Sequence, residues 1–414
     1  MAWKIFRTVV SVLLLMAVLI PTAIYVLLSL DGVQRTVKDV ASSELSRILG
    51  AEVNIGRIAI HPFNRLGIEE MSLVLNSSDT VASISNVSAR FELYHFIRTG
   101  EFVVDYALVA GASIHISRPE PGAPLNISPI LEHLRSDKPK EDKPFELKIN
   151  TVLLRNTSLT YDVVSAPMPA EGHFDPGHLN ISDLALNAYI PHLSNDGYSF
   201  QIDHLSFEEQ SGFSLKKLEA IAEISPKAIA VKRLSIDLDD SHLAFKPIEL
   251  SYNSLSDLRD ALYSKRLSLS TSSDSRISLS DLSPFVPAFA QTDLAFSFSL
   301  EAEGNLNEIT LERLLLRDTD SGSISLNMTA SASRLTSPDS LHYNVSNCSM
   351  LLDGQELSRH LASIVKPDVT NAINRIPLTA IHFNAEGSTE RGLLNLRTDG
   401  KAGALRVNGS YHRY

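Results

Sequence analysis

The sequence predicts a mainly β protein, in which a transmembrane helix and an amphipathic helix precede an elongated, curled, groove-like antiparallel-type sheet with a few short helices. Three observations lead to this fold class. Apolar and polar residues alternate with a period of two over most of the chain beyond residue 50, which is typical of antiparallel strands with one buried face. Helical periodicity is confined to short segments. Similar strand-like units also recur along the chain.

An apolar run at the N-terminus predicts a membrane anchor within residues 1–30. Residues 9–30 contain no charged side chain, and a helix of this length crosses a hydrocarbon core of about 30 Å. Lys4 and Arg7 precede the run, so the N-terminus is expected in the cytoplasm and the remainder in a bacterial periplasm. A cleaved signal peptide is the alternative, although no A-x-A site ends the run. The predicted anchor residues are Val9, Leu13, Leu14, Leu15, Val18, Leu19, Ile24, Val26 and Leu27.

Residues 31–50 have the spacing of an amphipathic helix. Apolar side chains recur every three or four residues, and Gly50 stands where a C-cap glycine belongs. Two interpretations are open: a helix that lies on the membrane or plugs one end of the β-region, and a helix that packs on a sheet.

The remainder divides into a first β-region at 51–134, a charged linker at 135–146 and a continuing repetitive β-region at 147–414. The linker RSDKPKEDKPF has two prolines and no periodicity. Short helical patterns occur near 93–98, at 128–134 and at 357–376. We expect about 25 short strands, too many for one open sheet to hold without curling or splitting. Either several β-sandwiches in series or one strongly curled sheet would satisfy this pattern.

Two segments, ALVAGASIHISR (107–118) and VLLRNTSLTYDV (152–163), resemble each other. In each, an apolar run meets a short Gly or Asn turn, and a second alternating run follows. A repeated unit that needs only its neighbours favours a single extended sheet.

The apolar positions of such strands would merge into a trough in which acyl chains are sheltered from water. The alternative is that the same residues form an ordinary sandwich core. The candidate lining residues are Ile114, Ile116, Leu159, Tyr161, Leu294, Phe296, Phe298, Leu300, Ile324, Leu326 and Met328.

Composition and motifs argue against several classes of function. The net charge of −11 and the scattered Lys and Arg argue against a nucleic-acid partner, and the single cysteine, Cys348, excludes an intrachain disulfide. No nucleophile elbow, phosphate-binding loop or HExxH motif is present. We therefore expect no enzyme, metal or cofactor. Asp318, Asp320 and Gly322 are more typical of a hairpin turn than of a calcium loop, and a cluster at 237–242 of a strand end.

Several diffuse patterns together resemble the AsmA-like superfamily, in particular its TamB-like members from Bacteroidota. They are the segments LSRILGAEVNI, LVAGASI, NISPIL, RISLSDLSPFVP and FSLEAEGNLNEITLERLLL, and the resemblance covers nearly the whole chain. None of them is a catalytic signature, so the resemblance is specific as an ensemble and weak at each position.

The resemblance implies an inner-membrane-anchored periplasmic protein of outer-membrane biogenesis. Two roles follow as expectations: conduction of phospholipid between membranes along an apolar trough, and assistance in outer-membrane protein assembly with a β-barrel partner. TamB-like chains are usually longer than this one, which ends in GALRVNGSYHRY. We therefore expect a truncated frame, a fragment or a short relative, in which the region that docks to the barrel is missing.

Overall fold

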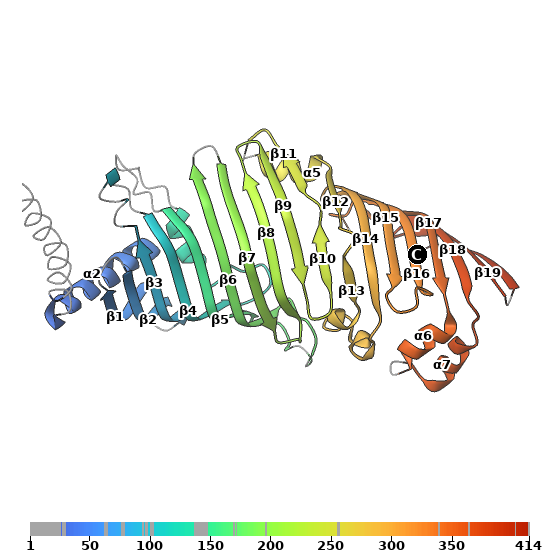
Figure 1. Ribbon diagram of the computed structural model, residues 1–414, viewed down its shortest axis with the longest axis horizontal. Coiled ribbons are helices and arrows are strands. Elements are labelled where there is room, and N and C mark those ends of the chain that lie inside the picture. The colour runs from blue at the N-terminus through green and yellow to red at the C-terminus, as the bar shows by residue number, and fades with distance from the viewer. Residues whose placement is uncertain are drawn as a thin grey trace, which may run out of the picture. The chain divides into compact units, whose positions relative to one another are not determined.

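In the part of the chain that the structure describes, twenty strands form one mixed, largely antiparallel sheet with few short helices (Figure 1). This computed structural model describes residues 26, 30–61, 65–75, 79–92, 95, 98–99, 103–135, 148–168, 170, 172–194, 197–254, 257–337, 340–362, 365–401 and 403–412. The mainly β prediction is confirmed. The expectation of about 25 short strands was too high, because the strands are longer than expected and reach 17 residues.

Three predicted segments fall largely outside the described residues. They are the membrane anchor, of which only Val26 and Leu30 are described, the charged linker from residue 136 onward, and most of the helix near 93–98. Within the part of the chain that is described, no helix is both long and apolar enough to cross a membrane.

The chain divides into two compact units. Unit 1 comprises residues 1–170, 175–190 and 207–210, and unit 2 comprises residues 171–174, 191–206 and 211–414. Unit 1 holds α2 (Asp31–Leu49), β1 (Glu52–His61), β2 (Arg65–Leu75), β3 (Asp79–Phe91), β4 (Val103–Arg118), α4 (Ser128–Arg135) and β5 (Lys148–Val163). Strands β6 (His178–Ser194) and β7 (Gly197–Glu209) contribute residues to both units.

Helix α2 packs on the apolar face of the first strands of unit 1. Its side chains Val37, Ala41, Leu45 and Leu49 contact the buried cluster of β1, which consists of Val53, Ile55 and Ile58. The helix ends at Gly50, whose φ of 66° is the left-handed conformation expected of a C-cap glycine. The interpretation of a helix packed on a sheet is therefore confirmed, and the same packing covers the start of the apolar face.

Helix α4 closes the same end of the apolar face from a second side. Ile130 packs with Ala51, Leu75 and Val81, and His133 Nε2 lies 2.9 Å from the carbonyl oxygen of Arg47 at the end of α2. The two helices together cover the beginning of the apolar face of unit 1.

The two similar segments form one parallel strand pair. Strand β4 pairs with β5 so that Ala107 lies beside Val152 and Arg118 beside Val163, an offset of 45 residues that matches the sequence repeat. The pair corrects the antiparallel expectation at this place, because alternation with a period of two is the same for both strand directions. The turn expected at the central Gly or Asn is also absent, because β4 continues through Gly111 and β5 continues through Asn156.

Gly111 and Asn156 instead occupy a left-handed backbone conformation inside their strands, with φ values of 65° and 49°. Glu70 and Asp183, in β2 and β6, have φ values of 56° and 51°. The strand register aligns Glu70, Gly111 and Asn156 across β2, β4 and β5, whereas Asp183 lies beside the neighbourhood of Ser158, two residues further along β5. Residues of this kind bend a strand locally.

Unit 2 is built mainly from strands that pair with their neighbours in sequence. It holds β8 (Ser214–Ile224), β9 (Ala228–Asp237), β10 (His242–Phe245), β11 (Ile248–Ser251), α5 (Leu258–Ser264), β12 (Leu267–Ser270), β13 (Arg276–Ser278), η2 (Ser280–Leu282), η3 (Pro287–Gln291), β14 (Ala295–Gly304), β15 (Glu308–Asp318), β16 (Ser325–Ser333), β17 (His342–Leu352), α6 (Gly354–Leu361), α7 (Pro367–Asn374), β18 (Thr379–Ser388), β19 (Arg391–Gly400) and β20 (Gly403–His412). From β14 to β20 each strand is antiparallel to the next.

A helical hairpin interrupts this succession between β17 and β18. The Asp353 carboxylate caps α6 by accepting from the backbone N–H groups of Gln355 and Glu356. Leu357 of α6 packs on the buried cluster of Leu294, Phe296 and Ile324. The hairpin α6–α7 lies near one end of β16–β18 (Figure 1) and covers part of the apolar face of unit 2.

Candidate functional site

The apolar face of unit 2 consists of rows of side chains that cross seven consecutive strands. One row runs through Leu300, Leu314, Met328, Cys348, Phe383, Leu396 and Val407. The adjacent row runs through Phe298, Leu316, Leu326, Met350, Ile381, Thr398 and Leu405. Only Thr398 among these fourteen is polar, so the apolar surface is continuous from β14 to β20.

Burial along the first row is uneven. Cys348 is 1% exposed, whereas Val407 on β20 is 43% exposed. The side chains in the middle of the row therefore cover one another, and the surface opens toward β20. Burial raises the pKa of the Cys348 thiol, as expected of an inert thiol in an apolar setting.

Four of the predicted lining residues of unit 2 belong to these two rows: Phe298, Leu300, Leu326 and Met328. The other three, Leu294, Phe296 and Ile324, lie in the closed cluster beneath Leu357 of α6. These three side chains are buried.

The predicted lining residues of unit 1 lie together on the parallel pair. Ile114 is beside Leu159, and Ile116 is beside Tyr161. All four are half-buried, and the Arg118 guanidinium lies 5.3 Å from the centre of the Tyr161 ring. Ile114 and Leu159 continue a row from Val53 through Leu73 and Ala82 to Ile181. The apolar face of unit 1 is thus also organised in cross-strand rows, closed at β1 by α2 and α4.

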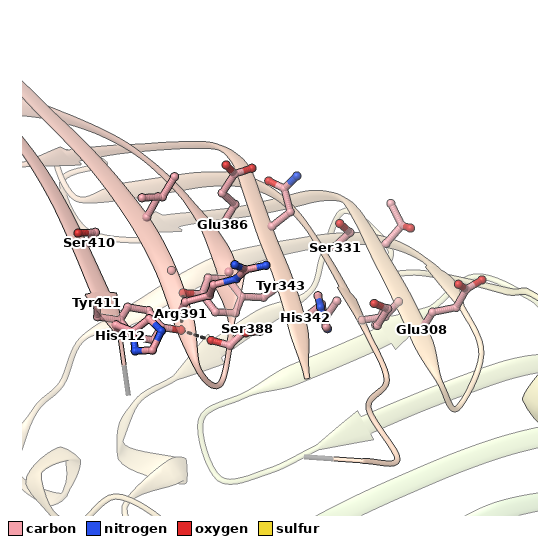
Figure 2. A pocket seen from close by; sticks show the side chains of 18 of the residues that line it. Glu308, Ser331, His342, Tyr343, Glu386, Ser388, Arg391, Ser410, Tyr411 and His412 are labelled. Atoms are coloured by element: carbon pink, nitrogen blue, oxygen red, sulfur yellow. Dashed lines mark hydrogen bonds between the residues drawn. The ribbon is translucent and has the colours of Figure 1, made fainter. Parts of the chain in front are cut away.

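A cavity of about 1080 Å³ lies at one end of strands β15–β20 in unit 2 (Figure 2). Its lining alternates along each strand, and most of it belongs to the face opposite the apolar rows. One cross-strand row contains Thr310, Ser331, Asn344, Glu386, Leu393 and Ser410, and the row nearest the strand ends contains Glu308, Ser333, His342, Ser388, Arg391 and His412. Arg266, Ile309, Ala332, Tyr343, Gly387, Gly392 and Tyr411 complete the lining. Because a twisted sheet is saddle-shaped, both its polar face and its apolar face can be concave.

Comparison with protein-family models, with curated proteins and with solved structures found no match to this chain.

Sequence analysis did not identify the residues of this cavity. Apart from Arg266, they come from six strands, and most of them are polar positions in an alternating pattern that is typical of solvent-facing strand residues. No local motif distinguishes Arg391 or Glu386 from the polar positions around them. Only the strand register brings them together.

The polar clusters at 318–322 and 237–242 stabilise a turn and a strand end. Both Asp318 carboxylate oxygens accept hydrogen bonds across the turn between β15 and β16, from the backbone N–H groups of Asp320, Ser321, Gly322 and Ile324. Burial favours the neutral carboxyl, but these hydrogen bonds outweigh it and lower the Asp318 pKa to about 2. The hairpin interpretation of this segment is therefore confirmed.

The cluster at 237–242 is the strand end that the sequence indicated. Asp237 is the last residue of β9 and His242 the first of β10. Their side chains meet with His242 Nδ1 2.5 Å from Asp237 Oδ1. Across the described ranges, no group of three His, Cys, Asp or Glu side chains is arranged to hold a metal ion.

Two further histidines form hydrogen bonds with aspartate. His178 in β6 is buried and bonds through Nδ1 to Asp162 of β5 at 3.1 Å. This hydrogen bond raises the pKa of His178 above its usual value of 6.5. His360 of α6 is buried, and its Nδ1 lies 2.5 Å from the carboxylate of Asp293, just before β14. The hydrogen bond from His360 lowers the pKa of Asp293 and ties α6 to the sheet.

Proposed function

We propose that this protein is a non-enzymatic conduit for phospholipid, anchored in a bacterial inner membrane by residues 9–30 and extending into the periplasm. The observation that carries the proposal is the continuity of the two apolar rows across β14–β20. The resemblance of the sequence to the AsmA-like superfamily supports the same function. Nothing in this proposal requires a nucleic acid, a cofactor or a metal.

The physical argument rests on how an acyl chain can leave a bilayer. Each methylene group exposed to water costs about 0.8 kcal/mol, so a lipid between two membranes needs apolar contact throughout its path. Rows of Leu, Met, Phe and Val place apolar side chains on successive strands, spaced about 4.8 Å apart. Because apolar contact is non-directional, a lipid can move along the rows without being held at one strand.

Photo-crosslinking in cells tests the conduit. A photoreactive amino acid at Leu300, Met328 or Leu396 is expected to give lipid adducts that mass spectrometry identifies. Ser299 and Asn395 are the matched controls, because each is adjacent in sequence and lies on the opposite face of the same strand. Protein adducts alone at all three apolar positions, or equal lipid labelling on both faces, would reject the conduit.

A second function is favoured by a different observation. Every residue of β20 is exposed, and the described pairings join β20 only to β19. An exposed strand edge accepts a strand from a partner by backbone hydrogen bonding. The alternative is therefore that the protein acts as a scaffold for outer-membrane protein assembly together with a β-barrel partner. Crosslinking from Asn408 distinguishes it, because a scaffold predicts a discrete protein adduct there and no lipid adduct at Leu396.

A further inference from the structure

Several charged side chains line the polar cavity of unit 2. Within the described part of the chain, Arg391, Glu386 and Glu308 make no side-chain hydrogen bond or ion pair, although all three line the cavity. Arg266, the other cation of the lining, is instead engaged by Glu303 at 3.6 Å and by the Thr310 hydroxyl at 3.0 Å. Arg391 and Glu386, on neighbouring strands, are thus left available for one ligand, whereas Glu308 lies four strands from Arg391.

Arg391 lies among groups that can donate hydrogen bonds to an anion. In the row nearest the strand ends, Ser388 separates it from His342, and His412 faces it directly on β20. Figure 2 shows Arg391 in the same group of lining side chains as Tyr343, Ser388 and His412. A guanidinium beside hydroxyl and imidazole groups is suited to a phosphate, whose oxygens accept several charge-assisted hydrogen bonds.

Glu386 makes the cavity unsuited to a simple anion. It lies on β18, the strand next to Arg391, and is one cross-strand row further from the strand ends. Diagonal positions on neighbouring strands lie about 7–8 Å apart. One small molecule with a cationic group near its anionic group can therefore reach both side chains. With Arg391 balanced by Glu386 on the neighbouring strand, a zwitterion is favoured over a bare anion.

We propose that this cavity binds a small zwitterion in which a phosphate group is joined to a primary amine, with Arg391 holding the phosphate and Glu386 the ammonium. The phosphoethanolamine group has this chemistry, either as a free molecule or as the headgroup of a lipid. The proposal goes beyond the lipid conduit, because the cavity lies mainly on the polar face and its ligand does not need the apolar rows.

Calorimetric titration of the full-length protein with soluble phosphoethanolamine tests the binding site. Arg391→Gln is expected to weaken binding by roughly tenfold or more, as for loss of a charged hydrogen-bond partner. The matched control is Arg397→Gln on the same strand and face, whose guanidinium is already paired with Asp399 at 3.0 Å and does not line the cavity. Equal losses in the two variants, or no binding by the wild-type protein, would overturn the proposal.

The role of Glu386 is tested by a second ligand. Glu386→Gln is expected to weaken binding of phosphoethanolamine while leaving the weaker binding of inorganic phosphate unchanged. Glu390→Gln is the control, because Glu390 follows β18 in the same hairpin but does not line the cavity. If Glu386→Gln weakens both ligands equally or neither, the amine is not recognised and the zwitterion assignment is wrong.

Vesicles distinguish the two sources of the ligand. We compare protein retention on phosphatidylcholine vesicles doped with phosphatidylethanolamine or with phosphatidylglycerol. If the protein prefers vesicles with the ethanolamine lipid and Arg391→Gln abolishes this preference, the ligand is a lipid headgroup. If the protein binds soluble phosphoethanolamine but shows no such preference, the ligand is a free molecule. Lipid crosslinking at Leu396 does not depend on the titration or the vesicle experiment. A negative result for the cavity would therefore not reject the conduit, and a negative crosslinking result would not reject the cavity.

Discussion

The hydroxyl groups of Tyr343 and Tyr411 lie 3.2 Å apart, although β18 and β19 separate their strands. The two side chains meet because Gly387 and Gly392 lie between them. A Cβ atom on Gly387 would stand 3.0 Å from the Tyr343 hydroxyl oxygen. The tyrosines therefore span two strands that carry no side chain at this row, and they tie the edge strand β20 to the interior of the sheet.

Gly392→Ala is expected to lower the free energy of unfolding by about 1–3 kcal/mol, the usual cost of overpacking. The added methyl group would meet Tyr411, because a Cβ there would stand 2.3 Å from Cε1. Urea unfolding measures the effect. Gly409→Ala is the control on the same face, since nothing lies within 4 Å of its Cβ position. Equal effects of the two substitutions would show that the tyrosine bridge is not formed in solution.

Asp318→Asn is expected to destabilise unit 2 by about 2 kcal/mol at neutral pH. The folded pKa of about 2 lies below the ordinary value of 3.8, so this stabilisation is present above about pH 4 and is lost as the pH falls toward 2. The free energies of unfolding of the wild-type and variant proteins should therefore converge as the pH is lowered from about 4 to 2. Asp320→Asn, at an exposed position in the same turn, should match the wild type at every pH.

The His178 imidazole is expected to titrate above 6.5 when followed by NMR, because its hydrogen bond with Asp162 favours the protonated ring. The stabilisation from this contact is complete below pH 6.5 and is lost as the pH rises through the raised pKa. Asp162→Asn should lower the His178 pKa, and Asp175→Asn should lower it by less. A larger effect from Asp175→Asn would contradict the assigned cause.

Gly111→Ala is expected to destabilise unit 1 by about 1–2 kcal/mol from backbone conformation alone. A further loss comes from contact, because a Cβ at Gly111 would stand 2.7 Å from the Ser85 hydroxyl oxygen. Gly122→Ala isolates the conformational part, since Gly122 also has a positive φ but open space around it. Asn156→Gly should be nearly neutral, whereas Asn156→Val should unfold at markedly lower urea.

The sequence was sufficient to predict the strands and their apolar faces, but it could not predict the strand pairing. Alternation placed Phe298 and Leu300 on one face of β14, and the structure agrees. The same pattern could not show that Phe296 would be covered by Leu357, because that contact joins segments 61 residues apart. It also could not reveal that β4 and β5 run parallel, since both strand directions share one period.

The polar cavity depends on a subtler feature of the strands. The register shifts between Leu311 and Leu314 in β15 and between Val345 and Cys348 in β17. Each irregularity changes which residues face each side, because the period of a strand is two. Thus the side on which His342 and Glu308 lie follows from local backbone geometry that no composition or spacing in those segments indicates.

The parallel pairing of the two similar segments has a consequence for how such a chain could lengthen. Strand β5 reproduces the direction, the left-handed residue and the facing side chains of β4 at a distance of 45 residues. Duplication of one such module would add a strand whose apolar side chains already lie on the same face of the sheet as those of its neighbours. The neighbouring strands would need no change. Growth by whole modules would therefore widen the sheet while preserving its two unlike surfaces.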